Sequence, residues 1–281
     1  EFSSNKRYKL NVKGIVQGVG FRPFVYQLAT TYKLVGFVCN DGSGVSIEIE
    51  GSGSNIKLFL IDLETITPPL SRIDSLKKEK IQLKNSLNFK IIKSTSSKIS
   101  TMLSADISLC DECLSEMNDK NNRRYAYPFI NCTNCGPRYS IINNLPYDRE
   151  QTSMQSFTMC KRCQEEYVNP NNRRYHAQPI SCYECGPKLK YINNKGVQEL
   201  DEKKALKKIC TLIKNGKVVA IKGVGGFHIV CDARNSTAIK FLRENKHRPS
   251  KPLAVMFRNI KSIKQVVSLT NTDEKLILSK Q

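Results

Sequence analysis

Eight cysteines in the middle of the chain have the residue type and the spacing of metal ligands. They form two copies of the pattern C-x2-C-x18-C-x2-C-G-P, and the second copy lies 50 residues after the first. A Cys-x-x-Cys turn places two thiolates on one side of an ion, and zinc binds four thiolates at tetrahedral angles. The spacing therefore predicts two structural zinc ions. The predicted ligands are Cys110, Cys113, Cys132 and Cys135 in the first repeat and Cys160, Cys163, Cys182 and Cys185 in the second.

Two pairings of the four turns satisfy this spacing. Consecutive turns can share an ion, or the first turn can pair with the fourth and the second with the third. We favour consecutive pairing, because each repeat then closes its own site. Disulfides and redox-active dithiols are the alternatives to zinc. Thiolate sites suit a reducing cytoplasm, and no apolar run approaches the length of a membrane span, so we expect a cytoplasmic protein without a signal peptide or a membrane segment.

The repeat extends beyond the cysteines to a polar run. Asn-Asn-Arg-Arg-Tyr at residues 121–125 recurs at residues 171–175. We expect these arginines to be exposed, where they either dock a partner or another domain or stay solvated. His176 stands where the first repeat has Ala126, and we expect it to be a surface residue, because each zinc already has four sulfurs. The small core of the first repeat is predicted to contain Tyr125, Tyr127, Phe129 and Ile130. The region resembles the paired zinc fingers of chaperone cysteine-rich domains.

A second group of residues, near the N-terminus, has the pattern of an anion-binding loop. Three glycines fall within seven residues at 14–20, directly before Arg22. Glycines let backbone N–H groups converge, and a following helix N-terminus and an arginine both attract an anion. We therefore predict a phosphate-binding loop. It consists of Gln17, Gly18, Val19, Gly20 and Phe21, with Arg22 as the cation.

The elements around this loop follow from hydrophobic periodicity. An alternating strand precedes the loop, and apolar residues at every fourth position, Phe24, Leu28 and Tyr32, predict a helix that ends at Gly36. Further alternating segments give the order strand, helix, strand, strand, helix, strand, which is a ferredoxin-like unit. The motifs G-x-V-Q-G-V-G-F-R and G-F-V-C-N resemble the acylphosphatase family over residues 7–93. This resemblance implies that Arg22 binds the phosphate of an acyl phosphate and that Asn40 positions the attacking water. We expect both side chains to lie at the surface.

The last ninety residues contain a third candidate site. An amphipathic helix near residues 205–213, a buried strand near 217–222 and a strand at 253–257 predict the beginning of an α/β domain. A glycine-rich turn at 223–226 and a basic loop at 246–251 could surround a polyphosphate. These stretches resemble the nucleotide-binding YrdC-like fold. The predicted nucleotide-binding residues are His228, Lys246, Arg248 and Lys251, and ATP with magnesium is the implied substrate.

The distribution of charge argues against a nucleic-acid partner, although the net charge is +20. Residues 94–190 have a balance of +2 and residues 191–281 a balance of +12. If the eight cysteines of the repeats bind two zinc ions as thiolates, the balance of the middle segment becomes −2. A segment of that charge is a poor partner for a phosphate backbone, so nucleic acid is an unlikely ligand.

The three regions together define the predicted architecture. We expect an α+β protein with an acylphosphatase-like domain at 5–93, a tandem zinc-finger domain at 105–190 and an incomplete YrdC-like domain at 198–281. This order resembles that of the hydrogenase maturation carbamoyltransferases, the HypF family.

The family resemblance implies an enzymatic pathway. It converts carbamoyl phosphate through carbamate and carbamoyl adenylate, and it passes the carbamoyl group to a cysteine of the partner protein HypE. Because the chain ends at Gln281, we expect it to retain only the hydrolysis of carbamoyl phosphate. The alternative is a zinc-organised RNA-binding or chaperone-type module without catalysis.

Overall fold

The computed structural model of the chain describes residues 5–94, 104–198 and 201–279. The chain divides into two compact units, Glu1–Pro187 and Lys188–Gln281, and each unit is described by itself. Within the described residues, no helix combines the length and the apolar character that crossing a membrane requires.

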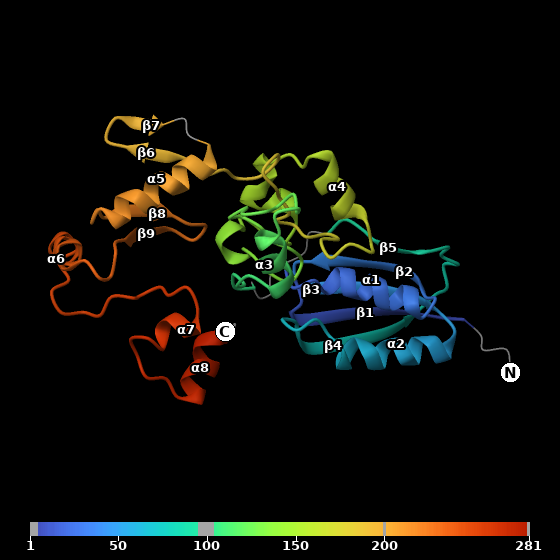
Figure 1. Cartoon of the computed structure of the whole chain (residues 1–281). Coiled ribbons are helices and arrows are strands. Elements are labelled where there is room, and N and C mark those ends of the chain that lie inside the picture. Colours follow the sequence, from blue (N-terminus) through green and yellow to red (C-terminus); the bar gives the residue numbers. More distant parts are fainter. Residues whose placement is uncertain (1–4, 95–103, 199–200, 280–281) are drawn as a thin grey trace. The chain divides into compact units, whose positions relative to one another are not determined.

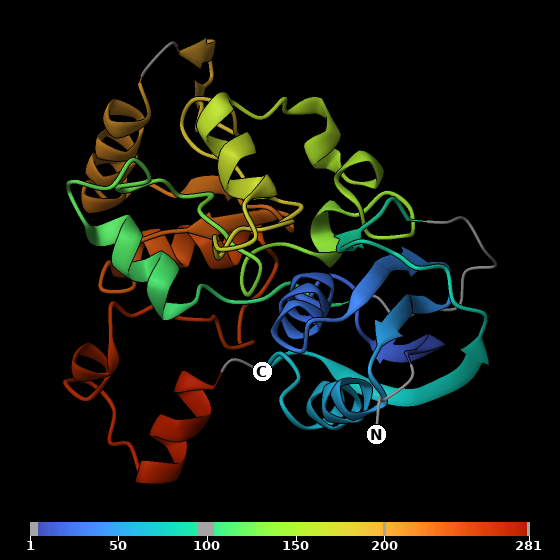
Figure 2. The same ribbon diagram turned by 90° about the vertical axis from the view of Figure 1, so that its right-hand side faces the viewer.

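The first unit begins with an α+β fold of the ferredoxin type, as predicted (Figure 1). Its five-stranded sheet has the order β4-β1-β3-β2-β5, and the β2–β5 pair is parallel while the other pairs are antiparallel. Helices α1 and α2 cover the same face of the sheet (Figure 2). The elements are β1 (Lys6–Ile15), α1 (Phe21–Thr31), β2 (Val35–Asp41), β3 (Gly44–Gly51), α2 (Gly53–Thr65), β4 (Arg72–Ile81) and β5 (Phe89–Ile91).

Helix α1 joins the phosphate-binding loop to the core. Its apolar side chains recur at helical spacing and are buried against the sheet and α2. The predicted end of this helix at Gly36 is wrong, because the chain leaves the helix after Thr31 and turns at Lys33, whose φ is 51°. Gly36 lies in β2 instead, where a Cβ would come within 2.0 Å of the Glu48 carbonyl oxygen. That glycine therefore permits a close strand approach rather than a helix end.

The rest of the first unit is a zinc-finger-like module with little regular structure. Helix α3 (Asp111–Asn118) and helix α4 (Lys161–Val168) each begin directly after the first cysteine of a repeat. Tyr127 and Ile130 are buried in the first repeat, but Tyr125 is only half-buried and lies outside that core. The connecting segment contains three short 3-10 turns, η1 (Tyr139–Ile141), η2 (Arg149–Gln151) and η3 (Ser153–Ser156).

The second unit contains two small hairpins and four helices among its described residues. Hairpin β6–β7 precedes α5, and β8–β9 forms the second antiparallel pair. The strand predicted at 253–257 is absent from the described structure, because this extended segment pairs with neither β8 nor β9. The elements are β6 (Tyr191–Asn193), β7 (Gly196–Gln198), α5 (Glu202–Lys214), β8 (Val219–Lys222), β9 (Phe227–Val230), α6 (Ser236–Asn245), α7 (Ile260–Ile263) and α8 (Asn271–Leu278).

Candidate functional site

The eight repeat cysteines form two separate clusters, each made by one repeat. In each cluster the four sulfurs lie within 4.8 Å of one another. The Cys110–Cys132 and Cys160–Cys182 sulfur pairs are both 3.7 Å apart. Zinc–sulfur bonds of about 2.3 Å give a tetrahedron with edges of about 3.8 Å, so both clusters fit a zinc ion. Consecutive Cys-x-x-Cys turns therefore share a site, and the spacings are too long for disulfides.

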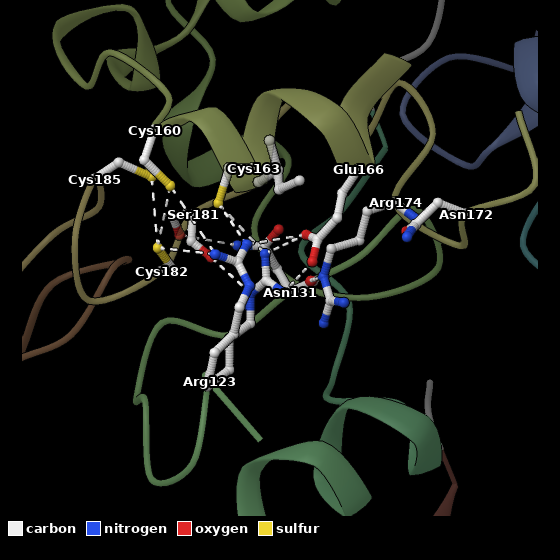
Figure 3. Close-up of polar contacts among 12 residues, drawn as sticks. Arg123, Asn131, Cys160, Cys163, Glu166, Asn172, Arg174, Ser181, Cys182 and Cys185 are labelled. Atoms are coloured by element: carbon white, nitrogen blue, oxygen red, sulfur yellow. Dashed lines mark hydrogen bonds and ion pairs between the residues drawn. The ribbon is translucent and has the colours of Figure 1, made fainter. Parts of the chain in front are cut away.

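The arginines of each repeat reach across to the cysteines of the other repeat. Figure 3 shows Arg123 of the first repeat beside the second cluster, where its Nη2 donates to the Cys163 sulfur at 2.9 Å. In the reverse direction, Nη2 of Arg173 donates to the Cys113 sulfur at 3.1 Å. Hydrogen bonds to thiolates reduce the excess negative charge of a four-cysteine site and orient its ligands. Each cluster is thus completed by a cation from the other repeat.

A second arginine in each repeat forms a buried ion pair across the same interface. Arg124 donates to the Glu166 carboxylate at 2.6 Å, and Arg174 donates to the Glu116 carboxylate at 2.5 Å. The side chains of these arginines are 2% and 4% exposed, so the prediction that the arginine runs are exposed is wrong for them. The reason is the reciprocal contact, which supplies each arginine with a carboxylate and a backbone carbonyl.

The arginines lower the pKa values of the carboxylates in these pairs. Burial alone would raise the pKa of Glu116 and Glu166, but the hydrogen bonds and charges of the arginines hold both pKa values below the usual range. Both glutamates are therefore ionised at neutral pH. The arginines, glutamates and thiolates form one network between the two clusters.

The predicted phosphate-binding loop lies between β1 and α1. Gly18 and Gly20 have φ values of 75° and 78°, in the left-handed region that favours glycine. Val19 and Phe21 are core residues with 1% exposure, so they can contribute only their backbone. The backbone N–H groups of Gly18, Val19 and Gly20 donate no hydrogen bond to any described residue. The loop therefore offers unpaired donors to an anion.

Gln17 fixes this loop to the neighbouring turn. Its side-chain amide donates to the carbonyl oxygens of Asp41 and Gly44 at 2.7 and 2.6 Å. The same side chain accepts a hydrogen bond from the Tyr147 N–H at 3.0 Å. Gln17 is thus a structural clamp of the loop in this structure, rather than a side chain that reaches into the pocket.

Arg22 and Asn40 converge on one point. Nη2 of Arg22 and Nδ2 of Asn40 donate to the same atom, the Tyr147 carbonyl oxygen, at 3.1 and 3.2 Å. Arg22 also forms an ion pair with Asp148 at 2.7 Å. The expectation that both side chains lie at the surface is wrong, because Arg22 is 8% and Asn40 is 1% exposed. The cover is the segment between the two repeats, which lies across them.

The pocket around these residues is shared by the acylphosphatase-like fold and the finger module, and we call it the Arg22 pocket. It is lined by Val16, Gly18, Gly20, Phe21, Arg22, Pro23, Asn40, Thr133, Arg138, Tyr147, His176, Ala177, Gln178 and Pro179.

Sequence reasoning missed the finger side of this pocket. His176, expected at the surface, is half-buried there, and Arg138 closes one wall by donating to the carbonyl oxygens of Gly18 and Thr133. A signal for His176 was present in the sequence, since it replaces Ala126 of the first repeat. No comparable signal marked Tyr147 and Asp148, because they lie between the repeats.

The predicted nucleotide-binding residues lie on two elements of the second unit. His228 is on β9, and Lys246 caps the C-terminus of α6. The loop that holds Arg248 and Lys251 folds around Arg243, which donates to the carbonyl oxygens of both. Among the described residues of this unit, no hydrogen bond or ion pair links His228 to Lys246, Arg248 or Lys251. Their role in nucleotide binding stays a prediction.

Three family models match the chain in the order that its elements suggest. Residues 8–91 match the acylphosphatase model. Residues 109–142 and 159–192 both match the HypF finger model. Residues 211–281 match the Sua5/YciO/YrdC model, which is described as telomere recombination. The fold class is thereby confirmed as an acylphosphatase-like domain, a finger module and the start of a YrdC-like domain.

Comparisons that cover nearly all of this chain point to one family. The chain is 48% identical, over 98% of its length, to the carbamoyltransferase HypF of Rhizobium leguminosarum bv. viciae. It is 51% identical, over 91% of its length, to the probable carbamoyltransferase HypF of Methanocaldococcus jannaschii. The chain spans 34% of the length of each of these relatives.

A solved structure gives the same result in three dimensions. A full-length HypF in the phosphate- and nucleotide-bound form matches the whole chain with a TM-score of 0.93 and 42% identity, and the match covers 36% of that protein. The chain therefore belongs to the HypF family of carbamoyltransferases.

Proposed function

We propose that the Arg22 pocket hydrolyses an acyl phosphate, and that its substrate is carbamoyl phosphate. The observation that carries this proposal is the convergence of Arg22 and Asn40 on one oxygen atom, 3.1 and 3.2 Å away. Two donors that meet at one oxygen atom can hold a phosphoryl oxygen and a water molecule side by side. The unpaired N–H groups of Gly18, Val19 and Gly20 add further donors for the phosphate.

The chemistry requires little beyond positioning and charge. In phosphoryl transfer, negative charge spreads over the equatorial oxygens, and an arginine stabilises it. Arg22 neutralises that charge, and Asn40 orients the attacking water in line with the bond that breaks. The Oδ1 atom of Asn40 is buried without a hydrogen-bond partner among the described residues, so it is available to accept a hydrogen bond from that water. The products are carbamate and inorganic phosphate.

The substrate phosphate replaces two groups that occupy Arg22 in this structure. These are the Asp148 carboxylate and the Tyr147 carbonyl oxygen. Both are oxygen acceptors, so the phosphate offers Arg22 equivalent hydrogen bonds and a larger charge. Binding therefore involves a shift of residues 147–148 away from Arg22.

We further propose that this hydrolysis serves a carbamoyltransferase of nickel-iron hydrogenase maturation. The support is the HypF family membership and the Sua5/YciO/YrdC match of residues 211–281. In this proposal carbamate reacts with ATP and magnesium at the YrdC-like region, where Lys246, Arg248 and Lys251 bind phosphate and His228 faces the substrate. The carbamoyl group then passes to a cysteine of HypE in the cytoplasm. Against the RNA-binding alternative stand Arg124 and Arg174, which are buried in ion pairs.

The test is phosphate release from carbamoyl phosphate by the wild-type chain and two pairs of variants. Arg22→Ala is expected to lose about 100-fold in kcat/KM through weaker phosphate binding, and Asn40→Ala about 100-fold in kcat through misplaced water. Because both residues are buried, Arg22→Lys and Asn40→Asp keep the side-chain volume and test the chemistry separately from folding. Arg162→Ala removes an exposed arginine and serves as the control. Wild-type rates in both alanine variants would refute the proposal.

A further inference from the structure

The finger residues that line the Arg22 pocket break the internal repeat. The repeat preserves the cysteines, Glu116 and the Asn-Asn-Arg-Arg-Tyr run, which hold the two fingers together. By contrast, all six finger residues on the pocket wall differ from their counterparts 50 positions away. The pairs are Thr133 and Tyr183, Arg138 and Lys188, His176 and Ala126, Ala177 and Tyr127, Gln178 and Pro128, and Pro179 and Phe129. The sequence pattern that the two fingers share therefore does not include the pocket wall.

His176 is a wall residue whose imidazole is held by ring packing alone in the described contacts. Its backbone is left-handed, with a φ of 54°, and Ala126 has the same conformation with a φ of 57°. The fold thus accepts alanine at this position. The imidazole packs on the rings of Tyr167 and Tyr175, at centroid distances of 5.0 and 4.6 Å, and it makes no hydrogen bond to any described residue.

The other polar side chain of the second finger in this wall is already satisfied. Gln178 donates to the His176 carbonyl oxygen at 2.8 Å, and its own oxygen accepts from the Arg149 N–H and the Tyr167 hydroxyl. It therefore cannot turn toward a ligand without breaking three hydrogen bonds. Of the second-finger polar side chains in this wall, the imidazole of His176 is thus the one with free donor and acceptor capacity in the described contacts.

The surroundings keep this imidazole neutral. Burial, followed by the positive charge of Arg22, lowers the pKa of His176 to about 4, and Asp148 opposes this only in part. A neutral imidazole has one N–H donor and one nitrogen lone pair. At neutral pH the wall thus presents a hydrogen-bond acceptor to the pocket, close to a cation that binds phosphate.

We propose that His176 is a specificity-determining residue of the Arg22 pocket, and that it accepts a hydrogen bond from the N–H2 group of a carbamoyl substituent. This inference rests on the proposed hydrolysis of an acyl phosphate. Acyl phosphates with a methyl group in place of the amine, such as acetyl phosphate, have no donor for this nitrogen. A pocket that pairs with a substrate N–H discriminates against an analogue that lacks it, because the buried acceptor is then left unpaired.

The experiment compares carbamoyl phosphate with acetyl phosphate in the wild-type chain and in His176→Ala, which restores the residue of the first finger. The kcat/KM for carbamoyl phosphate divided by that for acetyl phosphate is expected to be about fivefold lower in His176→Ala than in the wild-type chain. The reason is that only carbamoyl phosphate makes the hydrogen bond that is lost. His176→Asn keeps an acceptor and tolerates the left-handed backbone, so it should retain part of the ratio. Ala126→His is the matched control, because Ala126 is exposed and lies outside the pocket wall.

The outcomes separate this inference from the function on which it rests. Zinc content and far-ultraviolet circular dichroism establish that each variant is folded. Hydrolysis of both substrates with an unchanged ratio in His176→Ala would overturn the inference and leave the acyl phosphatase proposal intact. Hydrolysis of neither substrate by the wild-type chain would overturn both. A ratio that changes equally in Ala126→His would also overturn it, because the effect would then not come from the pocket.

Discussion

The two fingers share their metal ligands and their interface, but only parts of each face the Arg22 pocket. Glu116 and Glu166 occupy equivalent positions and receive the same type of arginine pair from the opposite finger. His176 and Ala126 also occupy equivalent positions, yet one lines the pocket and the other is exposed. The residues that pair the two fingers are thus the same in both repeats, whereas the finger residues of the pocket wall differ between them.

This comparison explains why a finger module lies next to an acylphosphatase fold. Tyr175 of the second finger packs edge-on against Tyr26 of α1, with ring centroids 5.5 Å apart. Arg138 of the first finger donates to the Gly18 carbonyl of the phosphate-binding loop. Zinc bound at the two four-cysteine clusters would hold the finger loops in shape, and these loops form one wall of the pocket. We therefore expect the metal to affect catalysis through the wall, although it takes no part in the reaction.

Removal of zinc is expected to have the largest effect on the molecule, because both fingers depend on the metal. The freshly purified, reduced chain should contain about two zinc ions, one for each four-cysteine cluster. A strong chelator should unfold the finger module, because small modules of this kind owe their fold to the metal, and should leave the ferredoxin-like sheet intact. Elemental analysis and limited proteolysis measure the two effects. A zinc content below one ion per chain would contradict the assignment.

Loss of one buried arginine tests whether the fingers depend on each other. Arg174→Ala removes one of the two arginines that pair with Glu116, whose ion pair with Arg173 at 2.8 Å remains, and we expect this loss to cost about 1.5 to 3 kcal/mol in stability. Since Glu116 lies in the first finger, the damage should appear as faster zinc release from the first cluster, although the substitution is in the second. Arg124→Ala should produce the reverse.

The measurement for this pair is the rate of zinc transfer to a colorimetric chelator. Cys113→Ser and Cys163→Ser variants, each with one impaired cluster, identify which kinetic phase belongs to which site. Arg162→Ala is again the exposed control. Release accelerated only from the substituted finger's own cluster would show that the fingers are independent.

The sequence was sufficient to predict the parts of the molecule that repeat or recur in regular patterns. Cysteine spacing predicted both metal clusters, and period-two and period-four apolar residues predicted the ferredoxin-like order. Consecutive pairing of the turns was favoured over one alternative and is confirmed, although spacing alone cannot say which sulfurs meet. The burial of Arg124 and Arg174 was missed for the same reason, because their carboxylate partners lie about forty or more residues away in the chain.

The cover of the Arg22 pocket could not be predicted from local patterns either. Tyr147 and Asp148 reach Arg22 across more than a hundred residues, and nothing in their own neighbourhood marks them as partners of a phosphate-binding loop. The position of His176 was accessible in principle, because comparison of the two repeats shows which residues depart from the shared pattern. In such a comparison each repeat serves as the reference for the other.

Substitution of Asp148 tests whether the segment between the fingers competes with substrate. Asp148→Asn removes the carboxylate that pairs with Arg22 at 2.7 Å but keeps the shape of the side chain. Because this carboxylate is partly exposed, its competition should weaken phosphate binding by about 1 kcal/mol, which is about fivefold. The inhibition constant of inorganic phosphate in the acetyl phosphate assay should therefore fall about fivefold in the variant. A weaker inhibition would mean that Asp148 instead supports phosphate binding by positioning Arg22.

The smallest expected effect is the dependence of folding stability on pH that His176 causes. Its pKa is lowered to about 4 in the folded chain, first by burial and then by Arg22, whereas an unfolded histidine has a pKa of about 6.5. Between these values the unfolded chain binds more protons than the folded chain, so stability is present above the unfolded pKa and falls as the pH falls. From about pH 7.5 to about pH 6 the loss of folding stability should be about 0.8 kcal/mol.

Denaturant unfolding at the two pH values should show this loss in the wild-type chain and not in His176→Ala. Ala126→His places a histidine at the exposed equivalent position and should add no such dependence, because an exposed imidazole titrates alike in both states. An equal loss in the wild-type chain and in His176→Ala would show that the imidazole is solvated and protonated as freely as in the unfolded chain, and would remove the neutral acceptor from the pocket wall.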